Sequence, residues 1–270
     1  MRNYDARSNM EIGEAAATWA GSRWVMVGDN RVRYREAGDG PAVVLVHGLG
    51  VSADYWFRNG PPLAAAGLRV LAPDLPGFGQ TPGPSDGLTV EEQARALLEW
   101  GDALGLGPAV YVGHSLSCQT VLHLAAEYPE RVRALILAAP TGMDGPHRRW
   151  HQAWGLFLDA WREPWALFPL VAAAYLRAGP YRYWKTWRAG AEDSLLPLLP
   201  QIRVPALVIV GTRDPVVREA DARKLAGALP MGKLAMVPGA AHAVIFDRSG
   251  EFNELVITTS AEVRKCGSAD

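Results

Sequence analysis

The sequence predicts an α/β protein with a mostly parallel sheet of roughly eight strands, helices on both faces and an inserted helical cap. Short runs rich in β-branched residues lack polar alternation, which is typical of strands buried on both faces. Stretches of helical period separate these runs, so the strands need crossover connections, which favour a parallel sheet. One long stretch without this alternation predicts the insertion.

The predicted elements follow one another in a regular order. Two β-type runs at 24–27 and 31–36 are joined by residues 28–30, Gly-Asp-Asn, which are typical of a hairpin turn. Further buried-strand runs lie at 42–46, 69–72, 109–112, 133–138, 206–210 and 233–237. Among the helical stretches between them, a T-x-x-E capping box at 89–92 opens the clearest helix, predicted over 89–103.

The alternation divides the chain into three parts. We expect a tail at residues 1–20, a core formed by residues 21–140 and 201–270, and a helical cap at residues 141–200. The cap holds many of the tryptophans, several of them at helical spacing. Such a stripe has two interpretations: the tryptophans pack the insertion onto the core, or the underside of the insertion lines an apolar substrate pocket. The candidates for substrate contact are Trp150, Trp154, Trp161 and Trp165.

The composition excludes several classes of protein and partner. With 49% hydrophobic residues and a net charge of −1, the chain is not disordered and is not patterned for nucleic acid or an anionic membrane. Cys118 and Cys266 are too few for a disulfide framework. The N-terminus lacks the apolar region of a signal peptide, and no apolar run approaches the roughly 18 residues that span a bilayer. We therefore expect a soluble, cytoplasmic protein.

A serine occupies the apex of a predicted strand, sharp turn and helix. The run Gly113-His114-Ser115-Leu116-Ser117 directly follows the strand at 109–112, and a helical stretch begins behind it. Such a turn forces the serine to a positive φ and needs small residues two positions before and after it. Gly113 meets this need. Ser117 stands where the G-x-S-x-G motif has its second glycine, so we expect a slightly tighter turn.

With this turn the chain resembles the α/β-hydrolase family, over about 220 residues from Arg31 to Ser249. Four further motifs at strand ends carry the resemblance. These are His47-Gly48-Leu49-Gly50, Asp74-Leu75-Pro76-Gly77-Phe78-Gly79, Asp214 in Gly211-Thr212-Arg213-Asp214-Pro215, and His242 in Gly239-Ala240-Ala241-His242-Ala243. The resemblance implies the fold of that family, whose catalytic residues follow the same chain order of serine, acid and histidine.

The chemistry requires these residue types in these roles. A serine hydroxyl is a poor nucleophile near neutral pH, so Ser115 needs a base within hydrogen-bond reach, and the imidazole of His242 suits this role. A carboxylate on the other ring nitrogen fixes the tautomer and stabilises the imidazolium, and Asp214 is expected to supply it. Asp144 is the rival acid, because some members of the family place the acid after the preceding strand.

The resemblance also implies two backbone donors for a developing oxyanion, at the N–H groups of Leu49 and Leu116. Leu116 opens a helix, whose N-terminal dipole favours negative charge. His47 and His114 are expected to be neighbours of the site, and we retain them as candidates for substrate contact. No metal or other cofactor is expected, because the chemistry of these residues requires none, and the glycine-rich turns lack the G-x-G-x-x-G spacing of a dinucleotide site.

Serine at the turn excludes the haloalkane dehalogenase and epoxide hydrolase branches of the family, which use aspartate there. We therefore expect hydrolysis of small-molecule carboxylic esters with a small to medium apolar part, through an acyl-serine.

Several other functions use the same fold or the same three residues. One alternative is a carbon–carbon hydrolase of the meta-cleavage type, and it is favoured by residues 56–59, which resemble a segment of those enzymes. Against it, the loop at 47–50 lacks their extended glycine-proline run, and Ala243 stands where they commonly carry tryptophan. A cofactor-free perhydrolase and a small-molecule receptor remain alternatives, and the oligomeric state stays open.

Overall fold

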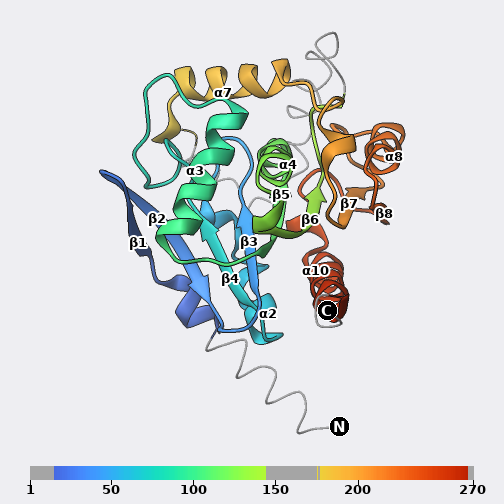
Figure 1. The fold of residues 1–270 in the computed structure, drawn as a ribbon, viewed down its shortest axis with the longest axis horizontal. Helices are drawn as coiled ribbons and strands as arrows, with labels where there is room; N and C mark the ends of the chain where they lie inside the picture. The colour runs from blue at the N-terminus through green and yellow to red at the C-terminus, as the bar shows by residue number, and fades with distance from the viewer. Residues whose placement is uncertain (1–14, 144–174, 176, 267–270) are drawn as a thin grey trace, which may run out of the picture.

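The computed structural model describes residues 15–143, 175 and 177–266 (Figure 1). Its centre is an eight-stranded sheet in the order β1-β2-β4-β3-β5-β6-β7-β8. Strand β2 pairs antiparallel with β1 and β4, and the other described pairs are parallel. The predicted α/β architecture is therefore confirmed. The strands are β1 (Arg23–Val27), β2 (Asn30–Ala37), β3 (Ala42–Val46), β4 (Arg69–Pro73), β5 (Ala109–His114), β6 (Val132–Ala138), β7 (Ala206–Gly211) and β8 (Gly232–Val237).

Helices cover both faces of the sheet, as Figure 1 shows. One hydrophobic cluster joins the sheet to α3 (Val90–Ala103), α4 (Ser117–Glu127) and α8 (Glu219–Ala228). The opposite cluster includes α2 (Gly60–Ala65), α9 (Val244–Asp247) and α10 (Ser249–Cys266). The remaining described elements are α7 (Pro180–Glu192) and the 3-10 turns η1 (Ala53–Trp56), η2 (Pro129–Arg131) and η4 (Leu199–Gln201). None of the described helices is long and apolar enough to cross a membrane.

Local sequence signals place the ends of two elements. The Thr89 hydroxyl accepts from the Glu92 N–H at 3.2 Å, and the Glu92 carboxylate accepts from the Thr89 N–H at 2.8 Å, so α3 begins at the predicted capping box. In the hairpin, Val27 pairs with Asn30, which leaves a two-residue turn in which Gly28 has a φ of 55°. Asn30 is therefore the first residue of β2 rather than part of the turn.

The end of the predicted N-terminal tail is part of the core instead. Residues 15–20 are helical, and the indole of Trp19 is only 3% exposed. It packs directly on Gly60, where a Cβ would lie 2.5 Å from the ring, so no larger residue fits at that position. The carbonyl of Trp19 also accepts a hydrogen bond from Arg35 at 2.5 Å. Large apolar rings are stabilised by such burial, which explains why this segment docks on the sheet.

The predicted cap is described only in part. Residues 144–174 and 176 lie outside the described residues, and α7 is the cap helix that the structure describes. The sequence-predicted residues Asp144, Trp150, Trp154, Trp161 and Trp165 all fall in the undescribed stretch. The division into tail, core and cap therefore remains a prediction for that stretch.

Replacing Trp19 with alanine is expected to lower the free energy of unfolding by about 3–5 kcal/mol, because it leaves a cavity against Gly60. The measurement is urea unfolding followed by circular dichroism. Trp184→Ala is the matched control, since that indole is 45% exposed and its loss is expected to change stability by no more than about 0.5 kcal/mol. Equal effects of the two substitutions would contradict the docking of residues 15–20.

Candidate active site

Ser115 lies in the turn between β5 and α4 with a φ of 57°. A non-glycine residue in this region costs about 1–3 kcal/mol and persists only where its surroundings hold it. Here the Ser115 N–H donates to the Ala138 carbonyl on β6 at 2.9 Å, and the Ser115 carbonyl accepts from the Cys118 N–H at 3.1 Å. A Cβ on Gly113 would lie 2.8 Å from the Cys118 Cα, so this position requires glycine.

Ser117 does more than occupy the place of the motif's second glycine. Its hydroxyl donates to the Val46 carbonyl at 2.7 Å and accepts from the His114 N–H at 2.9 Å, all within the buried core. The contact with Val46 joins the serine turn to the end of β3, directly before the loop at 47–50. The sequence predicted only a tighter turn, whereas the structure shows that the larger side chain is hydrogen-bonded on both sides.

The structure brings Ser115, His242 and Asp214 together. The His242 Nε2 lies 3.0 Å from the Ser115 Oγ, and its Nδ1 lies 3.1 Å from the Asp214 Oδ2. The other carboxylate oxygen of Asp214 accepts from the N–H groups of Val216 and Val217 at 2.7 and 2.9 Å. Burial raises the pKa of Asp214, but the charge and hydrogen bond of His242 and these N–H groups outweigh it, so the pKa is lowered overall.

The backbone N–H groups of Leu49 and Leu116 donate to no acceptor among the described residues. Such unpaired donors are rare where the backbone is buried, and Leu116 is only 7% exposed. The loop that carries Leu49 lies against the serine, because a Cβ on Gly48 would be 3.5 Å from the Ser115 Cβ. One of these donors thus belongs to the residue after Ser115, and the other belongs to a loop that lies against the Ser115 side chain.

His47 and His114 are buried, and their ring nitrogens bind the backbone. The His47 Nε2 accepts from the Leu75 N–H at 3.0 Å, and its Nδ1–H donates to the Gly48 carbonyl at 2.8 Å. The His114 Nε2–H donates to the His242 carbonyl at 3.1 Å. Burial lowers the pKa of His47, and burial together with the charge of His242 lowers the pKa of His114 to about 3, so both rings stay neutral. Both rings therefore support the backbone around the site, and their contact with a substrate stays a prediction.

Residues 41–179 match the model of a known family, described as the alpha/beta hydrolase fold. The chain belongs to this family. Among curated proteins it is similar to the 2-hydroxy-6-oxo-6-phenylhexa-2,4-dienoate hydrolase of Comamonas testosteroni, with 41% identity over 127 residues, which cover 44% of this chain and 43% of that protein. It is also similar to the bifunctional epoxide hydrolase 2 of Sus scrofa, with 39% identity over 107 residues, covering 39% of this chain and 19% of that protein. The matches thus span less than half the length of these relatives.

Two solved structures align over nearly the whole chain. A putative lipase from Acinetobacter baumannii AYE aligns with a TM-score of 0.79 and 22% identity, covering 96% of this chain and 97% of that one. A thermophilic esterase from Thermogutta terrifontis aligns with a TM-score of 0.78 and 21% identity, covering 90% and 99%. Identities this low show a common fold and leave the reaction open.

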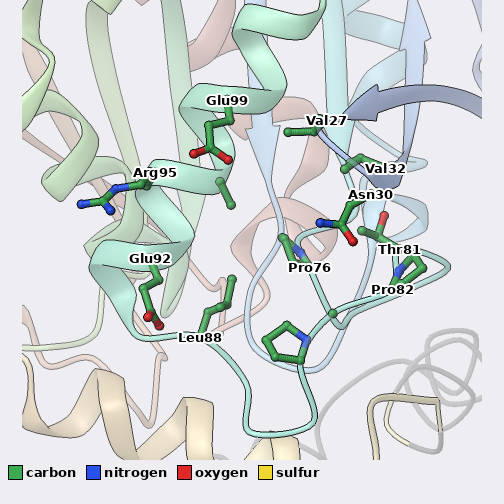
Figure 2. A pocket seen from close by; sticks show the side chains of 13 residues that line it. Val27, Asn30, Val32, Pro76, Thr81, Pro82, Leu88, Glu92, Arg95 and Glu99 are labelled. Atoms are coloured by element: carbon green, nitrogen blue, oxygen red, sulfur yellow. The ribbon is translucent and has the colours of Figure 1, made fainter.

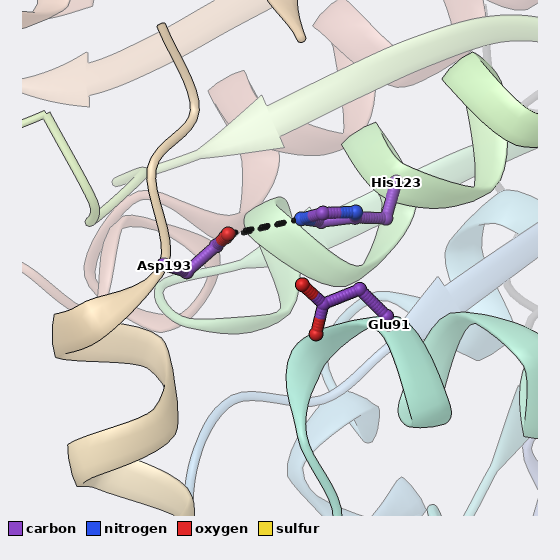
Figure 3. A group of neighbouring side chains, drawn as sticks. All are labelled: Glu91, His123 and Asp193. Carbon is purple, nitrogen blue, oxygen red and sulfur yellow. Dashed lines mark hydrogen bonds and ion pairs between the residues drawn. The ribbon is translucent and has the colours of Figure 1, made fainter. Parts of the chain in front are cut away.

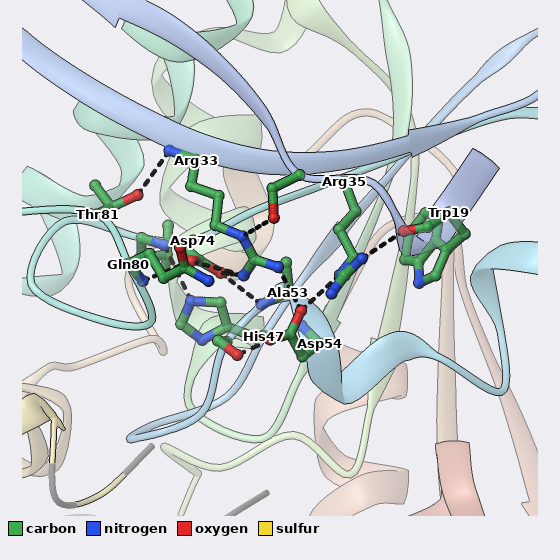
Figure 4. A network of polar contacts seen from close by, with 12 residues as sticks. Trp19, Arg33, Arg35, His47, Ala53, Asp54, Asp74, Gln80 and Thr81 are labelled. Atoms are coloured by element: carbon green, nitrogen blue, oxygen red, sulfur yellow. Dashed lines mark hydrogen bonds and ion pairs between the residues drawn. The ribbon is translucent and has the colours of Figure 1, made fainter. Parts of the chain in front are cut away.

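A buried polar network supports the loop that follows β3 in this hydrolase fold (Figure 4). Arg33 is 1% exposed and donates to Asp74 at 3.0 Å and to Asp54 at 2.6 Å. Asp74 also accepts from the N–H groups of Ala53 at 2.7 Å and Gln80 at 2.8 Å. Burial alone would raise the pKa of Asp54, but its pairing with the arginines lowers it. The paired charges therefore join η1 to the turn after β4.

Described residues of the predicted cap lie against the serine turn and the loop beside it. A Cβ on Gly190 of α7 would approach the Leu116 side chain to 2.5 Å, so this helix lies directly against the turn. Tyr175 and Tyr183 cover Gly50, where a Cβ would lie 2.8 and 3.0 Å from the two rings. Aromatic side chains of the cap region thus border the loop that carries Leu49, at positions that the sequence analysis did not single out.

Within the described part of the chain, one group of side chains has the composition of a metal site. Glu91, His123 and Asp193 have ligand atoms within 4.8 Å of one another (Figure 3). The His123 Nε2 lies 3.1 Å from an Asp193 oxygen. Burial lowers the pKa of His123, but Asp193, Glu91 and Glu127 outweigh it, so the pKa is raised. We interpret the group as an ion pair that fastens the end of α7 to α4.

A separate hollow of about 390 Å³ lies between the β1–β2 hairpin and α3 (Figure 2). Pro82 and Pro84 form part of one wall, and Glu92 and Arg95 of α3 form part of another. The lining includes none of the three residues of the Ser–His–Asp group. This hollow therefore does not belong to the candidate active site.

Replacing Ser117 with alanine is expected to lower the free energy of unfolding by about 1–3 kcal/mol, because the Val46 carbonyl and the His114 N–H lose a buried partner. Chemical denaturation measures the change. Ser85→Ala is the control, since the Ser85 hydroxyl is exposed and donates to the neighbouring Asp86. A change of less than about 0.5 kcal/mol in Ser117→Ala would show that the two hydrogen bonds contribute nothing.

The ion pair of His123 predicts a pH-dependent stability. The pKa of His123 is raised in the folded state. The stability that its ion pair contributes is therefore complete below the unfolded pKa of about 6.5 and is lost as pH rises through the folded pKa. Asp193→Asn is therefore expected to cost about 1 kcal/mol near pH 5.5 and less near pH 8.5. Thermal unfolding across this pH range measures the cost of the substitution. The pH-independent control is Asp102→Asn, because Asp102 pairs with Arg131. A cost that grows with pH would contradict the assignment.

Proposed function

We propose that the chain is a serine hydrolase that cleaves carboxylic esters through an acyl-serine intermediate. The observation that carries the proposal is the hydrogen-bonded line from the Ser115 Oγ through His242 to Asp214, with distances of 3.0 and 3.1 Å. These are the nucleophile, base and orienting carboxylate that acyl transfer requires. The positive φ of Ser115 supports the assignment, because strained serines of this kind project their hydroxyl from the end of the sheet.

In the acylation step, the His242 Nε2 takes the hydroxyl proton as the Ser115 Oγ attacks the ester carbonyl carbon. The carbonyl π electrons move onto oxygen, and the N–H groups of Leu49 and Leu116 donate to this oxyanion. The tetrahedral intermediate then collapses, the bond to the alkoxy oxygen breaks, and His242 returns its proton to the departing alcohol. An ester between Ser115 and the acyl group remains.

In the deacylation step, water takes the place of the alcohol. His242 accepts a proton from this water as the water attacks the acyl carbon. His242 then protonates the Ser115 oxygen as the carboxylic acid leaves. Asp214 stays ionised throughout, because its lowered pKa keeps it a carboxylate at neutral pH. It holds the His242 Nδ1–H and stabilises the imidazolium that forms in each step.

The proposed substrate is a small molecule with an apolar part of small to medium size. Tyr175 and Tyr183 beside Gly50 support this choice, because aromatic walls favour apolar ligands. The tryptophans of the cap segment support it from the sequence.

We place the enzyme in the cytoplasm on the cysteine content alone.

Carbon–carbon hydrolysis is the second candidate, and a specific observation favours it. Two of the similar curated proteins, from Comamonas testosteroni and Burkholderia cepacia, are 2-hydroxy-6-oxo-6-phenylhexa-2,4-dienoate hydrolases that share 41% identity with part of this chain. Two features of this chain favour esters instead. The loop at 47–50 has no glycine-proline run, and Ala243 follows the histidine where tryptophan is common in those enzymes. Epoxide hydrolysis is disfavoured because Ser115 replaces the aspartate of that branch.

Purified protein is expected to hydrolyse p-nitrophenyl esters between acetate and decanoate, and Ser115→Ala is expected to lose about 10⁴-fold or more in kcat. Ser85→Ala is the matched serine control and is expected to keep wild-type activity. The dienoate substrate of the similar hydrolases is assayed in parallel. A higher kcat/KM for that substrate than for every ester would replace the ester proposal with the carbon–carbon one.

A pair of aspartate variants tests the assignment of the acid. Asp214→Asn is expected to reduce kcat about 10⁴-fold, because the amide disturbs the tautomer of His242, whereas Asp144→Asn is expected to change kcat only a few-fold. Steady-state kinetics on the best ester measures both variants. The opposite ranking would transfer the role to Asp144.

A further inference from the structure

Three arginines converge on a hollow of about 450 Å³ outside the candidate active site. Its charged lining consists of Arg58, Arg213, Arg248 and Asp247. The arginines come from segments far apart in sequence: the turn after η1, the turn after β7, and the junction of α9 and α10. Three arginines and a single aspartate among the lining residues give this hollow an excess of positive charge, although the whole chain has a net charge of −1.

One of the three guanidinium groups is fixed in place. The Arg58 guanidinium stacks on the Phe246 ring at 3.6 Å, and its Nη1 donates to the Phe246 carbonyl at 3.2 Å. The remaining N–H donors of this planar group are held in one orientation, which lowers the entropic cost of binding an acceptor. Asp247 is also occupied, because one of its oxygens accepts from the Ala241 N–H at 2.9 Å.

The other two guanidinium groups lack acidic partners within the described part of the chain. Neither Arg213 nor Arg248 has a side-chain hydrogen bond or ion pair there. Other exposed arginines of the same chain do pair with nearby carboxylates, as Arg218 does with Asp221 and Arg223 with Glu219. The hollow therefore brings together two free guanidinium groups and one held in place, a combination that suits an external anion.

We propose that this hollow binds a small oxyanion with at least two negative charges, such as a phosphate group. Guanidinium groups form paired, charge-assisted hydrogen bonds with phosphate and carboxylate oxygens, and an anion with two charges would balance the excess positive charge of the lining. The volume accommodates a phosphate-bearing small molecule.

The hollow borders the loops of the candidate active site without containing its residues. Arg213 directly precedes Asp214, and Gly239 and Ala241, which also line the hollow, lie just before His242. An anion bound here would contact the outer side of both loops. The proposal does not rest on ester hydrolysis, because anion binding is measured without any turnover.

Isothermal titration calorimetry at pH 8 and constant ionic strength tests the site, with inorganic phosphate as the probe and acetate as the monoanionic comparison. We expect saturable phosphate binding at least tenfold tighter than acetate binding. The double variant Arg213→Gln/Arg248→Gln is expected to weaken phosphate binding about tenfold or more, because two charge-assisted contacts are lost. Arg218→Gln/Arg223→Gln is the matched control, since it removes two exposed arginines that already have acidic partners.

Thermal unfolding supplies a second readout, because a ligand that binds the folded state raises Tm. Phosphate is expected to raise the Tm of the wild type and of the control variant above that in sodium chloride of equal ionic strength, and to leave the first double variant unshifted. The proposal is overturned by non-saturable binding, by equal affinities for phosphate and acetate, or by unchanged phosphate binding in Arg213→Gln/Arg248→Gln. Circular dichroism confirms that each surface variant is folded.

Discussion

At Ser115, hydrogen bonds from neighbouring strands hold the backbone at a φ of 57°, and the geometry of the site depends on this constraint. Strand β6 holds the turn through the Ala138 carbonyl, and β3 holds it through the contact between Val46 and Ser117. The strain of about 1–3 kcal/mol is offset because these contacts are buried and cooperative with the sheet. Gly113 completes the turn, since any side chain there would collide with the following helix. The sheet therefore determines the position of the Ser115 hydroxyl.

Buried polar groups also hold the loops around the serine turn in place. His47, kept neutral by burial, joins the loop after β3 to the turn after β4, while the Arg33 network holds the same two segments from further out. Buried charges are costly unless each is paired and hydrogen-bonded, and Arg33 and Asp74 meet that condition. Loss of either partner would leave an unpaired charge in the core. Two sets of polar contacts, one on each side of Leu49 in the sequence, thus hold its loop to the turn after β4.

The sequence predicted the features that depend on local pattern. Six of the eight strands follow from buried-strand runs, the first two follow from β-type runs around a hairpin turn, and the start of α3 follows from the capping box at 89–92. The serine turn was also predicted, because its small neighbours are close in sequence. Contacts between distant residues were not predictable in this way. The pairing of Arg33 with Asp74, the hydrogen bonds of Ser117 and the burial of Trp19 each depend on which strands become neighbours, and single-residue patterns do not encode that pairing.

Covalent labelling tests whether Ser115 is an activated nucleophile, and it requires no choice of substrate. A fluorophosphonate is attacked by an activated serine and forms a stable phosphonyl adduct with loss of fluoride. Intact-mass spectrometry followed by peptide mapping is expected to find one adduct, on Ser115, and to find none in His242→Ala. An unlabelled protein, or a principal adduct on another residue, would contradict the role of Ser115 as the nucleophile.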